Sequence, residues 1–142
     1  MDAPRHDGRV ALAAQGRRRR GDAGAHRRWR AGDFVQLTLP MPVRRVLAHP
    51  EVKADQDRFA IERGPLVYCA EGADNDGRVL DKRFPGKVRL ESASKPELLG
   101  GIVTVKLVGE PNGDALNCIP YYAWGHRGAN EMRVWFPVTT GK

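Results

Sequence analysis

Eight short runs of alternating apolar and polar residues, separated by turn residues, limit the fold of this chain more than any other feature. Successive side chains of a strand point to opposite faces of a sheet, so this alternation is typical of strands with one buried face. The clearest run, residues 102–108, is rich in β-branched residues. The other runs cover residues 34–39, 43–47, 58–62, 66–70, 87–91, 115–119 and 132–136. The series predicts an all-β fold, a jelly-roll-like β-sandwich of about eight short strands.

The spacing between these runs leaves no segment long enough for a stable helix. Ser94 and Glu97 have the spacing of a helix capping box. Gly100 and Gly101 follow closely, so we expect at most one helical turn before the next strand.

Positive charge gathers at the start of the chain. Residues 1–30 hold nine Arg and three Asp, a net charge of +6, whereas the whole chain carries +7. Residues 1–28 show neither helical nor strand periodicity, so we expect a disordered basic arm, followed by a β-sandwich region over residues 29–142. The Arg17–Arg20 run would suit phosphate contacts, but the charge-balanced remainder argues against a nucleic-acid surface.

Targeting signals are not visible in the sequence. The chain lacks an apolar run of about 20 residues that would span a bilayer. It also lacks a signal-peptide core of about 7–15 apolar residues. We therefore expect no membrane partner and take the cytoplasm as the default location.

Common catalytic and metal-binding patterns are also missing from the sequence. The only serines, Ser92 and Ser94, lie outside a Gly-x-Ser-x-Gly turn, and the four histidines are far apart. Residues 74–77 resemble part of a calcium loop, but glycine and arginine would stand at its first and last ligand positions. We predict no catalytic, cofactor-binding or metal-binding residue. Cys69 and Cys118 allow one disulfide across the sandwich, although two buried free thiols fit this residue type better.

Two segments are unusually dense in aromatic, proline, glycine and arginine residues. They are residues 63–71, Arg-Gly-Pro-Leu-Val-Tyr-Cys-Ala-Glu, and residues 119–128, Ile-Pro-Tyr-Tyr-Ala-Trp-Gly-His-Arg-Gly. Tyr121, Tyr122 and Trp124 could stack on sugar rings, but we favour a role in the sandwich core or a domain seam. Arg127 could clamp a ligand carboxylate or stack on a ring, but we favour a structural ion pair with a nearby acid.

These segments belong to an ordered series of motifs. The others are Trp29–Asp33, Leu39–Arg44, Leu98–Ile102, Met132 and Trp135. In this order the chain resembles the C-terminal region of glycoside hydrolase family 127, the β-L-arabinofuranosidase-like enzymes. That family usually has Ala-Asn where this chain has Gly125-His126, a small departure in a loop.

The resemblance implies an α/α-barrel domain followed by β-sandwich domains. It attributes catalysis to the barrel, where zinc held by a glutamate and cysteines supports a cysteine nucleophile. Such a site needs three clustered cysteines, two of them adjacent in sequence. Cys69 and Cys118 do not match this pattern, so no functional residue carries over.

We therefore expect the non-catalytic C-terminal β-sandwich portion of such a hydrolase. Its partner would be the catalytic α/α-barrel domain, which would hold the zinc, and a homodimer is a further arrangement. A free-standing carbohydrate-binding module is the alternative, and nucleic-acid binding through the arginine-rich arm is a weaker one. The Arg/Ala/Gly-rich residues before Trp29 have the composition of GC-rich DNA read out of frame. We therefore expect a truncated or frameshifted gene product.

Overall fold

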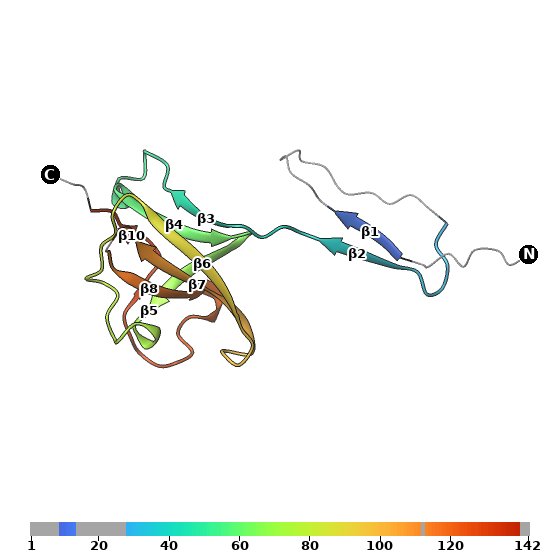
Figure 1. Ribbon diagram of the computed structural model, residues 1–142. Coiled ribbons are helices and arrows are strands. Elements are labelled where there is room, and N and C mark those ends of the chain that lie inside the picture. The colour runs from blue at the N-terminus through green and yellow to red at the C-terminus, as the bar shows by residue number, and fades with distance from the viewer. Residues whose placement is uncertain (1–8, 14–27, 112, 140–142) are drawn as a thin grey trace, which may run out of the picture. The chain divides into compact units, whose positions relative to one another are not determined.

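The computed structural model describes residues 9–13, 28–111 and 113–139. The chain divides into two compact units, Met1–Pro40 and Met41–Lys142 (Figure 1). No helix in the described ranges is both long enough and apolar enough to cross a bilayer.

The first unit contains two parallel strands. Strand β1 (Arg9–Ala13) pairs with β2 (Phe34–Thr38), from Arg9 opposite Phe34 to Ala13 opposite Thr38. Strand β2 was expected, but β1 was not. The prediction relied on alternation of apolar and polar side chains, whereas β1 pairs with β2 through backbone hydrogen bonds, which need no such alternation. Val35 and Leu39 are exposed, so the expectation of a buried face was wrong for these two residues. The rest of the expected disordered arm, apart from Arg28, lies outside the described residues.

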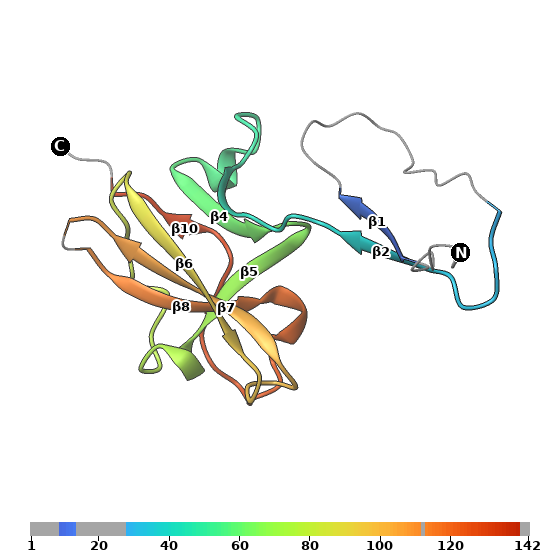
Figure 2. The ribbon, with the colours of Figure 1, turned by 45° about the vertical axis from the view of Figure 1, so that its right-hand side comes forward.

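The second unit is one antiparallel sheet of eight strands, which curls into a half-barrel (Figures 1 and 2). Its main path runs β10-β4-β5-β8-β7-β6, with β3 also paired to β4 and β9 to β5. The strands are β3 (Val43–Leu47), β4 (Arg58–Arg63), β5 (Leu66–Glu71), β6 (Val88–Lys95), β7 (Ile102–Gly109), β8 (Ala115–Pro120), β9 (Met132–Arg133) and β10 (Phe136–Pro137). The all-β prediction is confirmed.

Short 3₁₀ helices are the only helical elements among the described residues. They are η1 (Lys53–Asp55), η2 (Gly72–Asp74) and η3 (Tyr121–Ala123). No helical turn forms at Ser94, which is within the expected limit of one, because Ser94 and Lys95 continue β6 and pair with Val103 and Ile102 of β7. The backbone ladder of the β6–β7 hairpin therefore prevails over the local capping pattern.

The predicted strand over residues 132–136 divides in two. Met132 pairs with Glu71 of β5, whereas Phe136 pairs with Phe59 of β4. The two intervening residues carry the chain from one partner strand to the other, so the apolar pattern is continuous but the pairing is not.

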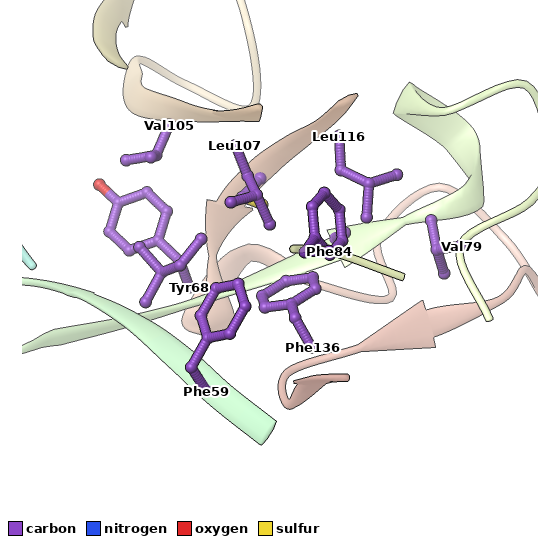
Figure 3. Packing of buried hydrophobic residues seen from close by; sticks show 11 residues of the cluster. Phe59, Tyr68, Val79, Phe84, Val105, Leu107, Leu116 and Phe136 are labelled. Carbon is purple, nitrogen blue, oxygen red and sulfur yellow. The ribbon is translucent and has the colours of Figure 1, made fainter. Parts of the chain in front are cut away.

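The inner face of the curl holds the main core. Phe59, Phe84 and Phe136 form a three-ring cluster with centroid separations of 5.7–6.1 Å (Figure 3). The other fully or almost fully buried members are Ile61, Tyr68, Ala70, Val79, Val105, Leu107, Leu116 and Cys118. They come from β4, β5, β7, β8 and the loops, so the curl itself creates the enclosed apolar volume.

A smaller core lies on the outer face of the sheet. It consists of Cys69, Ile102, Ile119 and Ala123, with Leu98, Leu99, Met132 and Val134 packed against it. Cys69 lies opposite Ile119, and Cys118 lies opposite Ala70, so the two cysteines belong to different faces. Both are buried free thiols, as the sequence favoured, and no disulfide joins them.

Candidate functional site

Residues 63–71 and 119–128, the two segments dense in aromatic, proline, glycine and arginine residues, are called the signature segments below. They meet at a buried ion cluster of Glu71, Asp74 and Arg127. Glu71 ends β5 and is fully buried, and η2 brings Asp74 beside it. Arg127 Nη2 donates to Glu71 Oε2, and Arg127 Nη1 and Nη2 each donate to one Asp74 carboxylate oxygen at 2.5 Å. The Gly125 amide donates to Glu71 Oε1 at 2.8 Å. The predicted structural ion pair of Arg127 is confirmed.

Hydrogen bonding keeps these groups charged despite their burial. Burial would raise the pKa of Glu71, but the Gly125 amide and the Arg127 guanidinium outweigh it and hold the pKa below its ordinary value. Hydrogen bonds to Asp74 raise the pKa of Arg127 against the opposing effect of burial. At neutral pH Glu71 is therefore an acceptor with no proton to donate, which suits a clamp rather than an acid catalyst.

A second polar contact fixes the same end of the sheet. Asn75 Nδ2 donates to the carbonyl oxygens of Glu71 and Asn117 at 2.7 and 3.0 Å. Its Oδ1 accepts from the Asn117 amide at 2.7 Å. Residues 74–77, which resembled part of a calcium loop, thus form a turn in which Asn75 binds the protein's own backbone and Asp74 binds Arg127.

The aromatic residues that follow β8 lie at the surface. Tyr121 and Trp124 are each 43% exposed, and Tyr122 is 62% exposed. The rings of Tyr121 and Trp124 stack on one another with centroids 6.1 Å apart and planes inclined by 24°. Of residues 121–124, only Ala123 belongs to the smaller core. The core interpretation of these rings is therefore wrong, whereas a domain seam and a sugar-stacking surface stay predictions.

A hollow of about 420 Å³ opens between the β4–β5 hairpin and the β6–β7 hairpin. Arg63, the last residue of β4, and Tyr122 both line it. Arg63 Nη1 lies 3.8 Å from the sulfur of Met41, and the Tyr68 hydroxyl donates to the Val103 carbonyl at 2.9 Å. Residues of both segments line the hollow: Arg63, Leu66 and Tyr68 come from residues 63–71, and Pro120 and Tyr122 come from residues 119–128.

The cysteines do not fit a zinc site. Burial raises the pKa of Cys69 to about 12 and raises that of Cys118 as well, so both thiols stay protonated at neutral pH. They lie on opposite faces of the sheet, and the described part of the chain brings no three His, Cys, Asp or Glu side chains together at metal-binding distance. These residues do not suit the metal that the family resemblance implies.

Sequence reasoning missed three residues of these sites. Asp74 and Asn75 were considered only as parts of a calcium loop, and Arg63 had no assigned role. A signal for Arg63 existed: it directly precedes Gly64-Pro65, a two-residue hairpin loop that places it at the end of the sheet.

Comparison with known proteins identifies the second unit. The profile of the glycoside hydrolase family 127 C-terminal domain matches residues 43–137. The chain belongs to this family. It is also similar to the non-reducing end β-L-arabinofuranosidase of Bifidobacterium longum subsp. longum, with 36% identity over 131 residues. That match covers 73% of this chain and 20% of the relative. The family resemblance seen in the sequence is confirmed.

Two solved structures share this fold. One is the family 127 β-L-arabinofuranosidase of Geobacillus stearothermophilus T6, with a TM-score of 0.61 and 35% identity over 70% of this chain and 18% of that one. The other is a family 127 β-arabinofuranosidase with a TM-score of 0.62 and 40% identity over 69% of this chain and 17% of that one. The chain thus spans about a fifth of the length of its relatives.

Proposed function

We propose that this chain acts as the non-catalytic C-terminal β-sandwich portion of a β-L-arabinofuranosidase-like glycoside hydrolase. The observation that carries the proposal is the match to the C-terminal domain of family 127, over about a fifth of each relative's length. The Glu71 carboxylate, fixed in a salt-bridged clamp, and the two protonated buried thiols support a structural rather than a catalytic role.

The curled sheet supports the sandwich architecture. Its β4 and β7 regions supply Phe59 and Leu107 to one shared core, as the two layers of a sandwich do. The Arg45 guanidinium of β3 also donates to the Gly86 carbonyl just before β6, which ties the two ends of the curl together.

The partner in this proposal is a catalytic α/α-barrel domain, which would also hold the zinc. The stacked, exposed Tyr121–Trp124 pair is the contact surface that suits it, because exposed aromatic side chains concentrate at interfaces. In the absence of that domain, the same surface would favour self-association, including a homodimer.

An activity assay tests the proposal directly. The purified chain should release no arabinose from β-L-arabinofuranosides, with or without added zinc. Sedimentation velocity should show concentration-dependent association that Trp124→Ala reduces. Leu80→Ala, which removes another exposed apolar side chain, should leave association unchanged. Zinc-dependent turnover by the purified chain would refute the proposal.

A carbohydrate-binding module is the second candidate, favoured by the exposure of the stacked Tyr121–Trp124 rings. Tryptophan fluorescence titrated with arabino-oligosaccharides separates the two functions. A saturable change that Tyr121→Ala abolishes would favour carbohydrate binding. A flat titration would favour the structural role.

A further inference from the structure

The hollow lined by Arg63 and Tyr122, at the open end of the curled sheet, carries positive charge alone. Among the described residues that line it, Arg63 is the only charged one, beside Met41, Leu66, Tyr68, Ser94, Pro96, Gly101, Ile102, Val103, Pro120 and Tyr122. Other hollows of the molecule mix both signs: one has Arg58 with Asp55 and Asp57, and another has Arg83 with Glu110 and Asp114. The Arg63 hollow is therefore an electropositive recess with no internal counter-charge.

The sheet itself places the guanidinium there. Phe59, Ile61 and Arg63 alternate along β4, and the first two are fully buried in the inner core. Arg63 is the next member of this inner series, so its side chain stands where the core opens. Within the described residues it forms no ion pair, and its side chain contacts the neutral Met41 sulfur and the Tyr68 hydroxyl. A partly buried guanidinium with five donors is thus left without a carboxylate.

The rest of the lining indicates what accompanies the carboxylate. Tyr122 presents an exposed ring at the rim, and Ser94 adds a hydroxyl. Leu66, Ile102 and Pro120 supply apolar surface. A ring with one apolar face and polar edges suits this lining, and the mouths of β-barrels are common ligand sites. The volume of about 420 Å³ falls within the ordinary range of small-molecule sites.

We propose that this hollow binds a sugar acid, with Arg63 holding its carboxylate as a bidentate pair and Tyr122 stacking on its ring. This site goes beyond the structural role proposed above and uses the hollow rather than the stacked Tyr121–Trp124 pair. It also differs from a general anion site, because it requires both the charge and the sugar ring.

The test is a titration of the full ¹⁵N-labelled chain with D-galacturonate, followed by NMR. D-Galactose lacks only the carboxylate, and acetate lacks the ring. Galacturonate should shift the Arg63, Ser94, Val103 and Tyr122 amide signals saturably, and galactose and acetate should each bind at least about tenfold more weakly. Affinity should fall as salt is added.

Matched variants identify the residues responsible. Arg63→Met should weaken galacturonate binding at least about tenfold, and Arg63→Lys should weaken it partly, because an ammonium lacks the planar fork. Tyr122→Ala should also weaken binding. Arg44→Met removes an equal charge from the other face of the sheet, where Arg44 of β3 pairs with Glu62 of β4, and should leave affinity unchanged. Thermal melting of each variant checks that it is folded.

Three results would overturn the proposal. The first is the absence of saturable shifts with galacturonate. That result would favour an acidic side chain of another polypeptide segment as the partner of Arg63 in the hollow. The second is galacturonate binding that a folded Arg63→Met variant retains. The third is acetate binding as tight as that of galacturonate, which would reduce the hollow to a simple anion site.

Discussion

The ion cluster beneath the signature loop gives the sharpest stability prediction. Arg127→Met keeps an unbranched side chain of moderate length but removes the guanidinium. The variant loses the donors to Glu71 and Asp74 and leaves the fully buried Glu71 carboxylate with the Gly125 amide at 2.8 Å. A buried charge without its counter-charge is the main source of the expected cost.

The structure sets the size of this cost. Removing one partner of a buried ion pair costs about 3–5 kcal/mol. The side chains of Arg127 and Asp74 are 21% and 17% exposed, so water compensates part of the loss. We expect about 3 kcal/mol, which is a large share of the roughly 5–15 kcal/mol that stabilises a typical domain. The same change should lower Tm by about 12–24 °C for a domain of this size.

Urea denaturation followed by circular dichroism measures the effect. Arg78→Met is the matched control, because Arg78 is 70% exposed in its pair with Asp81 and should contribute at most about 1 kcal/mol. Adding Glu71→Gln to Arg127→Met should restore at least about 1 kcal/mol, since the orphan charge disappears. If Arg127→Met lowers the free energy of unfolding no more than Arg78→Met does, the ion cluster of Glu71, Asp74 and Arg127 does not stabilise the fold in this way.

Four further predictions concern acid stability, thiols, packing and a turn. The pKa of Glu71 in the folded chain lies below its ordinary value of 4.5. The stability that the Glu71 carboxylate contributes is therefore complete above pH 4.5 and is lost as the pH falls through the folded pKa. The free energy of unfolding of Glu71→Gln, measured in urea, should lack this acid dependence. Ellman's reagent at neutral pH should find no rapidly reacting thiol in the folded chain and two, Cys69 and Cys118, in guanidinium chloride. Phe84→Ala should cost about 3–5 kcal/mol by urea denaturation, because its ring contacts two other buried phenylalanine rings. Gly64→Ala should lower the urea midpoint by an amount equivalent to about 1–2 kcal/mol, since Gly64 has φ of 57° and an added Cβ would lie 3.0 Å from a methionine side chain; an unchanged midpoint would contradict this turn geometry.

Strands with one buried face were predictable because their alternation records which face is buried. Residues 43–47 became β3 with the expected bounds, and the clear run at 102–108 became β7, one residue longer. The break between β9 and β10 could not be predicted, because it depends on which of two distant strands pairs with each residue. Strand β1 was missed for a related reason, since its pairing with β2 is a backbone interaction.

The site was predictable in its parts but not in its arrangement. An acidic partner for Arg127 was predicted without being identified, because residues 71 and 127 become neighbours only when β5 and the loop after β8 meet. The exposure of Tyr121 and Trp124 could not be predicted from the sequence either. The smaller core takes Ala123 between them, and a run of apolar residues does not show which of its members the sheet will cover.

The two signature segments build both sites, and this makes stability and binding separable. Glu71 and Arg127 join the segments in the clamp, whereas Arg63 and Tyr122, from the same segments, line the hollow. A variant that breaks the clamp frees the loop carrying Tyr122 and should therefore weaken both stability and galacturonate binding. Arg63→Met leaves the clamp intact and removes a guanidinium without an ion-pair partner among the described residues, so it should weaken binding while Tm changes little. A large loss of stability in Arg63→Met would mean that Arg63 supports the fold rather than a ligand.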